Sequence, residues 1–421
     1  GESNVISVTS EQGPYPGAAS ARTTNLGKLL PVQSGRVIST AEDLVYLVSE
    51  AGGVDSAEFV YRRLDDAVTD GFGADDPRWF RGFHHPESMA VAANSAIVYS
   101  SVYRRIVLLT ALAIANNFQT SVRNIDTSRY DEWDAFSSTP LGTSLPAATV
   151  GNLAAVELAD GRLLLAVRIG TSTHDFDIYQ SKDGGDSWAR TSRGIIARTG
   201  ATLVAMDTNS QIRIARSGEH LRLAYIENAT NTIKSLYSSD RGATWTVTTD
   251  GLTTHLQAGV NSDPRCFDLT GVDDSGLFMI NWISSTATVG FYYGRADAGF
   301  VLTTITPNIT APHPVYSVVN MRTPSWLYVW VLYSDLAVGK EDAWEFYRIR
   351  PPEASITQPA NWERASPISQ HEGMEYMPGR VQATWTGNEA VFWGGSRDSS
   401  ATFNEGVRGQ LWYTGGWSQR S

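Results

Sequence analysis

Two stretches of the chain, Ser181-Lys-Asp-Gly-Gly-Asp-Ser-Trp188 and Ser238-Ser-Asp-Arg-Gly-Ala-Thr-Trp245, share the form Ser-x-Asp-x-Gly-x-Ser/Thr-Trp and lie 57 residues apart. The aspartate of each can accept hydrogen bonds from the backbone amides of a turn, because its short side chain reaches back to the local main chain. The glycine permits a positive φ, and the closing tryptophan can pack between neighbouring sheets. We therefore expect both stretches to be structural turns rather than catalytic sites. The residues that build them are Ser181, Asp183, Gly185, Trp188, Ser238, Asp240, Gly242 and Trp245.

This spacing belongs to a repeat that extends over most of the chain. Aromatic residues 54 to 62 positions apart close successive units: Trp79, Trp133, Trp188, Trp245, Phe300, Trp362 and Trp417. An apolar segment precedes each of them, at 44–49, 106–112, 163–167, 221–226, 277–283, 327–332 and 390–393. A second segment follows each apolar one, at Phe59, Thr120, Asp177, Ser235, Phe291, Glu345 and Gln410. Short segments separated by Gly, Asp and Asn predict four-stranded antiparallel units with little helix.

Seven such units predict an all-β fold, a seven-bladed β-propeller of four-stranded antiparallel blades, because radial repetition protects the sheet edges. Six blades is the alternative count, and a pair of stacked β-sandwiches is the alternative fold. We expect a single propeller domain over residues 28–421, after an N-terminal arm over residues 1–27. Because an exposed edge invites aggregation, part of this arm is expected to pair with a sheet edge, either of this chain or of a partner chain.

Composition excludes several classes of protein. Of the 421 residues, 42% are hydrophobic and 18% charged, as in ordinary globular proteins. The net charge of −11 argues against binding along a nucleic-acid backbone, and the longest uncharged apolar run, residues 106–115, is too short to insert across a membrane. The single cysteine, Cys266, excludes an intrachain disulfide and a cysteine-cluster zinc site. Nucleotide-binding, zinc-protease and EF-hand motifs are missing, so we expect no cofactor and no metal.

The two turn stretches resemble the Asp box of the sialidase-like, or BNR-repeat, β-propellers. In that family the Asp boxes lie on the propeller face opposite the ligand site. Sialidases clamp a sugar carboxylate with three arginines from separate blades, and by position Arg36, Arg265 and Arg380 look like such a set. Their nucleophile is a tyrosine polarised by a glutamate, a role that Glu375 with Tyr376, or alternatively Tyr316, could fill. The family's Phe/Tyr-Arg-Ile-Pro segment is missing here, and sialidases have six blades.

The loops between blades, and those between the second and third strands of a blade, are expected to form the binding face. Histidine titrates near neutral pH, and the histidines expected on this face are His84, His85, His174, His255, His313 and His371. A glycosidase would also need a pair of carboxylates there, and the candidates are Asp55, Asp175, Glu227, Glu372 and Glu375. Alternatively, the first-strand arginines, including Arg213 in a fourth blade, pair with acids of the next blade and tie the blades together.

Three functions remain open. The first is a carbohydrate-recognising propeller on a cell or virion surface, such as an adhesin or a phage receptor-binding module, whose partner is a glycan or an acidic sugar. The second is a sialidase-like glycoside hydrolase or a polysaccharide lyase that acts on acidic glycans. The third is a structural or assembly propeller that docks proteins. A fold class alone does not choose among them.

Overall fold

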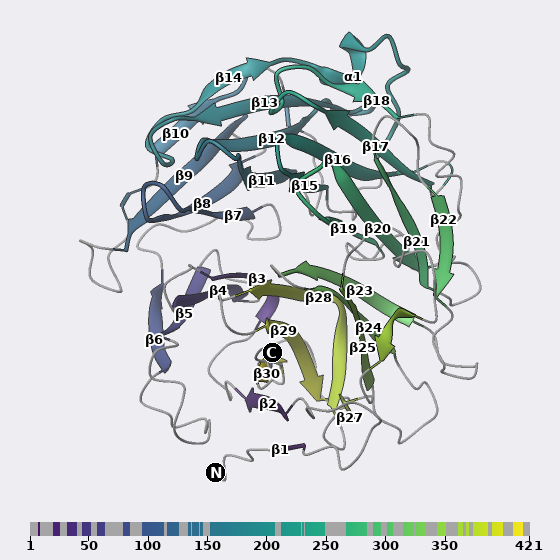
Figure 1. The fold of residues 1–421 in the computed structure, drawn as a ribbon. Coiled ribbons are helices and arrows are strands. Elements are labelled where there is room, and N and C mark those ends of the chain that lie inside the picture. The colour runs from purple at the N-terminus through teal and green to yellow at the C-terminus, as the bar shows by residue number, and fades with distance from the viewer. Residues whose placement is uncertain are drawn as a thin grey trace. The chain divides into compact units, whose positions relative to one another are not determined.

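The protein, seen in a computed structural model, is almost entirely β-sheet (Figure 1). The structure describes, with short gaps, residues 95–145, 152–248, 267–283, 315–333, 343–350 and 361–364, and elsewhere only the backbone of the strands. Within this part of the chain the strands group into seven antiparallel sheets, and the one helix is α1 (Ile195–Arg198). Contacts divide the chain into two compact units. The first contains Gly1–Ser88, Ile309–Arg350 and Trp362–Ser421, and the second contains Met89–Asn308 and Pro351–Asn361.

The second unit contains four sheets of four strands each. Sheet by sheet, the strands are β7 (Ser95–Ser100), β8 (Arg105–Leu112), β9 (Asn117–Asn124) and β10 (Ser137–Pro140); β11 (Leu153–Glu157), β12 (Leu163–Ile169), β13 (Asp175–Ser181) and β14 (Ala189–Ser192); β15 (Arg213–Ser217), β16 (His220–Glu227), β17 (Thr232–Ser238) and β18 (Thr246–Val247); and β19 (Phe267–Gly271), β20 (Leu277–Ile283), β21 (Val289–Arg295) and β22 (Val301–Ile305). The first strands of successive sheets contact one another, and the fourth strands lie at the outer edges (Figure 1). Within this unit the sheets therefore have the radial order that the repeat predicts.

The first unit contains three sheets. Their strands are β3 (Val32–Ser39), β4 (Leu44–Ala51), β5 (Ala57–Arg63) and β6 (Trp79–His84); β23 (Val315–Arg322), β24 (Leu327–Tyr333), β25 (Ala343–Ile349), β26 (Glu363–Arg364) and β27 (Ile368–Ser369); and β28 (Met374–Trp385), β29 (Ala390–Asp398), β30 (Val407–Gly415), β2 (Ser20–Asn25) and β1 (Ser7–Val8). Strand β2 pairs antiparallel with β30, so that Ser20 lies opposite Gly415 and Asn25 opposite Gln410. The expectation that a segment of residues 1–27 pairs with a sheet edge is confirmed, and the edge belongs to the same chain.

The aromatic residues that define the repeat lie at the starts of outer strands wherever they are described. Trp79 is the first residue of β6, and Trp188, Trp245 and Trp362 immediately precede β14, β18 and β26. Trp133, Phe300 and Trp417 lie outside the described residues. The register of the repeat is therefore correct in four units, two in each part of the chain.

Strand β12 shows why the apolar segments become the second strands of their sheets. All seven of its residues are buried. Because successive side chains of a strand point to opposite faces, Leu163 and Leu165 pack into the core shared with β7, β8 and β9. Leu164 and Ala166 pack into the core shared with β16 and β17. A strand that is covered on both faces has no solvent side, so its sequence is continuously apolar instead of alternating.

Candidate functional site

The two turns that share the sequence motif contain the hydrogen bonds expected of them. Asp183 Oδ1 accepts from the Ser187 amide at 3.0 Å and from the Ser181 hydroxyl at 2.7 Å. Asp240 Oδ1 likewise accepts from the Thr244 amide at 2.8 Å. Burial alone would raise the pKa of each carboxyl group, but these hydrogen bonds outweigh burial and lower both pKa values. Both aspartates are thus ionised and committed to their own turns.

Each turn also fastens its sheet to the preceding sheet. At Gly185, where φ is +103°, a Cβ atom would lie 2.7 Å from Val107 Cγ2 of the preceding sheet. At Gly242, where φ is +84°, it would lie 2.5 Å from Leu164 Cδ1. Glycine is therefore required at both positions for its backbone conformation and for the close approach of the turn. Arg105 strengthens the first of these contacts with an ion pair to Asp186 at 2.5 Å.

Asp175, one of the carboxylates considered for catalysis, holds the helix α1 in place. Its Oδ1 accepts the Ile196 amide at 2.7 Å, and its Oδ2 accepts the Ala197 amide at 3.0 Å. Asp177, two residues further along β13, accepts the Gly194 amide at 2.9 Å. Both carboxylates are buried. Because free amides at a helix start are stabilised by carboxylates, these two residues fix α1 against the end of β13.

Glu227, the last residue of β16, is also engaged by its neighbours. Its carboxylate accepts the hydroxyls of Thr230 and Thr232, the latter at 3.2 Å, and lies 3.5 Å from Lys234 Nζ. Burial would raise the pKa of Glu227, but Thr230, Lys234 and Thr232 together lower it. A general acid needs a raised pKa to hold its proton near neutral pH, so these surroundings suit a permanently charged carboxylate instead.

His174 anchors the connection between β14 and β15. Its Nδ1 lies 3.0 Å from the Met206 amide and 3.1 Å from the Arg168 guanidinium. Both groups are donors, so Nδ1 accepts and the ring is neutral. Burial, with the positive charge of Arg168 as the second cause, lowers the pKa of His174 to about 4. The backbone amide of His174 donates to the Val204 carbonyl at 3.0 Å, which adds a second attachment for the same connection.

The structure places the remaining sequence candidates only in part. Arg36 lies on β3, and Glu375, Tyr376 and Arg380 lie on β28, which contacts β3 within the first unit. The candidates outside the described residues are Asp55, His85, His255, Arg265, His313, His371 and Glu372. The convergence of the three arginines on one ligand therefore stays a prediction.

Arg213 shows what an arginine on a first strand can do. Its Nε lies 3.3 Å from Asp268 Oδ1, and both side chains are largely buried. Arg213 belongs to β15 and Asp268 to β19, so the ion pair joins the first strands of neighbouring sheets. This is the tie between sheets that was the alternative to a ligand clamp.

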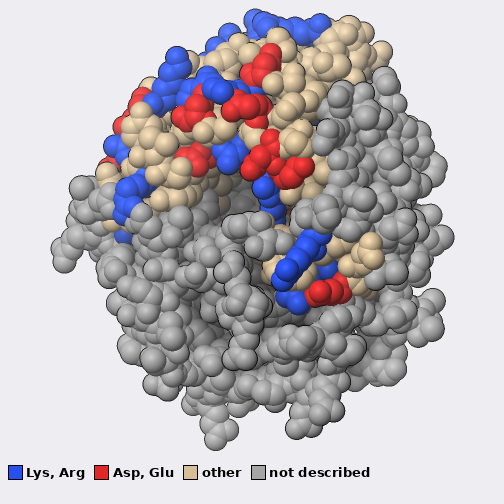
Figure 2. All heavy atoms as spheres, in the orientation of Figure 1, with Lys and Arg blue, Asp and Glu red and all other residues tan. Residues whose placement is uncertain are grey.

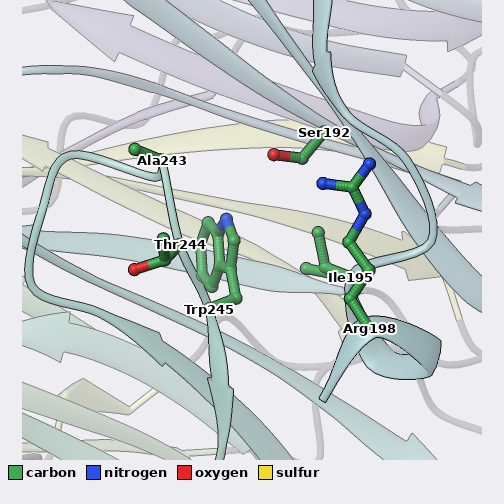
Figure 3. Close-up of a pocket in the computed structure, with 6 residues that line it drawn as sticks. All are labelled: Ser192, Ile195, Arg198, Ala243, Thr244 and Trp245. Carbon is green, nitrogen blue, oxygen red and sulfur yellow. The ribbon is translucent and has the colours of Figure 1, made fainter. Parts of the chain in front are cut away.

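A pocket of about 210 Å³ lies between the outer strand β14 and the turn that leads into β18 (Figure 3). Its lining residues are Ser192, Ile195, Arg198, Ala243, Thr244 and Trp245. Figure 3 shows the Trp245 indole on one side, with the Arg198 guanidinium and the Ser192 hydroxyl on the other. The indole Nε1 donates to the Gly242 carbonyl at 3.0 Å, which fixes the ring. The pocket thus offers an aromatic plane, one cation and the Ser192 hydroxyl to a small ligand, whereas the Thr244 hydroxyl is donated to Asp240 at 2.6 Å.

Sequence reasoning missed half of this pocket. It assigned no element to residues 193–212. The family resemblance implied that the second turn lies on the face opposite the ligand site, whereas Ala243, Thr244 and Trp245 line the pocket. One signal was available in the sequence. Ile195 and Ile196 are adjacent in an otherwise polar segment, and both are buried. Two neighbouring isoleucines in a loop indicate a local packed element.

Charged side chains of both signs are interspersed over the described surface in Figure 2. Recognition of a charged ligand there would depend on local groups rather than on a broad field of one sign. No group of three His, Cys, Asp or Glu side chains in the described part of the chain is arranged to hold a metal ion. Among the same residues, no helix is long and apolar enough to cross a membrane.

Comparison with solved structures shows a likeness to two polysaccharide lyases. A PL25 ulvan lyase has a TM-score of 0.54 at 8% identity, over 91% of this chain and 95% of that chain, and another structure of a PL25 ulvan lyase is bound to -[GlcA(1-4)Rha3S]-. The lyase Uly1 has a TM-score of 0.51 at 11% identity, over 90% of both chains. No protein family and no curated protein matches the sequence. The likeness establishes the fold, an all-β propeller architecture of four-stranded sheets.

Proposed function

We propose that this protein is a carbohydrate-binding β-propeller of the sialidase-like Asp-box type, in which the seven sheets are the blades of one domain. The observation that carries the proposal is the pocket in which Trp245 faces Arg198 and Ser192. A sugar ring has an apolar face of C–H groups, which can lie on an aromatic plane, and a rim of hydroxyls that need hydrogen-bond partners. The pocket supplies both kinds of contact.

The fold supports the same proposal by analogy. A propeller of similar architecture binds a glycan in the ulvan lyase structure. An acidic, aromatic-rich chain with a sugar-sized pocket suits a module displayed outside the cell or on a virion, such as an adhesin or a receptor-binding protein. Its partner would then be a glycan of the opposing surface.

A polysaccharide lyase is the second candidate, favoured by the likeness to two lyases over nine-tenths of the chain. Such an enzyme would cleave an acidic glycan by elimination. The group that abstracts the proton would come from the first-strand and loop candidates, such as Tyr376 or His371.

A glycan-array screen, paired with incubation with uronate polymers, tests both candidates. The first predicts binding without cleavage, and the second predicts an unsaturated uronate product with new ultraviolet absorbance. Trp245→Leu removes the aromatic plane, so it should abolish array binding. Because Trp245 also packs against the core of these two sheets, the variant should melt at a lower temperature, and its binding is measured where circular dichroism shows it to be folded. If the protein neither binds a glycan nor cleaves a polymer, both proposals fail and protein docking is left.

A further inference from the structure

We infer that the pocket selects sugars that carry an anionic group, a carboxylate or a sulfate ester, and that Arg198 recognises this charge. The inference rests on the proposed function, because it assumes that the pocket holds a sugar. Its first support is the lining itself. Arg198 is the one charged residue among the six, so the pocket has a net charge of +1 in a protein of net charge −11.

The carboxylates of the surrounding elements are already engaged. Asp175 and Asp177 bind the amides of α1, and Asp177 also lies 3.3 Å from Arg190. Asp240 accepts the amide and the hydroxyl of Thr244, the latter at 2.6 Å. Within the described residues, no carboxylate lies within ion-pair distance of the Arg198 guanidinium. None of these described carboxylates thus competes with an anionic ligand for Arg198.

The backbone that carries the exposed Arg198 side chain is anchored before any ligand arrives. Arg198 is the last residue of α1, and three amides of residues 194–197 are bound by two buried carboxylates of β13. A guanidinium on an ordered base loses less entropy when it binds a planar anionic group through two parallel N–H bonds. Ile195 supplies an apolar wall between Arg198 and Trp245, which lowers the local polarity and strengthens the charge interaction.

The preceding pair of sheets gives an internal comparison. Trp188 occupies the same motif position as Trp245, but Phe118 packs against its ring edge-to-face at a centroid distance of 6.0 Å. Trp245 instead faces the pocket, because α1 stands between β14 and the next sheet. Within the described residues, the one helix is α1, which follows this sheet. The motif by itself therefore does not create such a pocket, because at Trp188 Phe118 packs on the ring.

Calorimetric titration with matched sugars tests the inference. Methyl β-glucuronide is compared with methyl β-glucoside, and methyl galactoside 6-sulfate with methyl galactoside, so that each pair differs in the anionic group. We expect at least one anionic member to bind about 10-fold or more tightly than its neutral partner. Arg198→Gln should weaken that anionic sugar about 10- to 100-fold and remove the preference. Arg193 is an exposed arginine of the same connection that does not line the pocket. Arg193→Gln should therefore change neither the affinity for the anionic sugar nor the preference over its neutral partner.

The outcomes separate this inference from the proposed function. If both members of each pair bind equally and Arg198→Gln has no effect, the charge preference is wrong and the carbohydrate proposal stands. If no sugar binds at all, while the array also stays negative, both are overturned. If an anionic sugar does bind more tightly, the glucuronide pair and the galactoside 6-sulfate pair show whether the pocket recognises a carboxylate or a sulfate ester. Arg198→Lys keeps the positive charge but loses the two parallel N–H groups of the guanidinium. Its affinity for the anionic sugar should therefore lie between those of the native protein and Arg198→Gln.

Discussion

At the scale of single residues, the clearest constraint lies around His174. Its Nδ1 faces the Met206 amide and the Arg168 guanidinium, so a protonated ring would direct an N–H at two donors. The carboxylate of Asp175 is turned to the α1 amides, and Glu227, which pairs with Met206 through its backbone, is held by Lys234 and two threonines. Neither acid is placed to neutralise a charged imidazole. The native state therefore requires a neutral ring.

Stability should consequently depend on pH through His174. Its pKa is about 4 in the folded protein against 6.5 in the unfolded chain, so between these values the unfolded state binds more protons. The neutral His174 ring therefore contributes up to about 3 kcal/mol to the free energy of unfolding. This contribution is fully present above pH 6.5 and is lost as the pH falls toward 4. His174→Asn keeps an acceptor but does not titrate. The free energy of unfolding, measured in urea at several pH values from 7 to 4, should therefore depend less steeply on pH in this variant. An identical slope in both proteins would contradict this account.

The two turn aspartates give a matched pair of variants. Asp183→Ala and Asp240→Ala each leave turn amides without an acceptor, and each should lower the free energy of unfolding by about 1–3 kcal/mol. Only Asp240→Ala should also weaken saccharide binding, because the Thr244 side chain that it holds lines the pocket. Urea denaturation and calorimetric titration measure the two effects. Asp186→Ala is the control, since its exposed ion pair contributes little to stability.

At the scale of elements, α1 is too short to be stable alone, because isolated helices below about 12 residues are marginal in water. Its four residues persist through the carboxylates beneath them. Asp175→Ala should thus release α1 while the sheet remains, and hydrogen exchange should accelerate strongly at the amides of Ile196 and Ala197. Asp183→Ala, at the opposite end of β13, should leave these amides protected. Equal protection of the two amides in both variants would show that packing, not Asp175, holds the helix.

The sequence predicts the strands well because their signal is strong and local. The apolar segment 163–167 lies within β12, and its burial on both faces explains the run of leucines. The helix α1 was not predicted, because four residues carry no helical periodicity and the carboxylates that stabilise it lie some 20 positions away. The pocket was missed for a related reason. Ser192 and Trp245 meet only because one sheet packs on the next, which no single segment reveals.

At the scale of the whole molecule, the pairing of β2 with β30 completes a sheet. Deletion of residues 1–25 should expose the edge of β30, lower the free energy of unfolding by about 2 kcal/mol or more and promote self-association. Light scattering and urea denaturation measure both effects. A peptide of residues 18–27 added in trans should reverse them, whereas a scrambled peptide should not. A deletion variant that stays monomeric and equally stable would show that this strand is dispensable.

The same pairing has a consequence for how the protein is made on the ribosome. Strand β2 leaves the exit tunnel early, but its partner β30 follows only after roughly 385 further residues, which takes about 20 to 80 s at ordinary rates of translation. Closing so long a segment also costs about 5 kcal/mol of chain entropy. The four sheets of Met89–Asn308 rely on contacts between consecutive strands and can form meanwhile. The nascent chain thus carries β2 unpaired while these residues are made. In that period chaperones can bind β2, and neighbouring nascent chains on one messenger can exchange it.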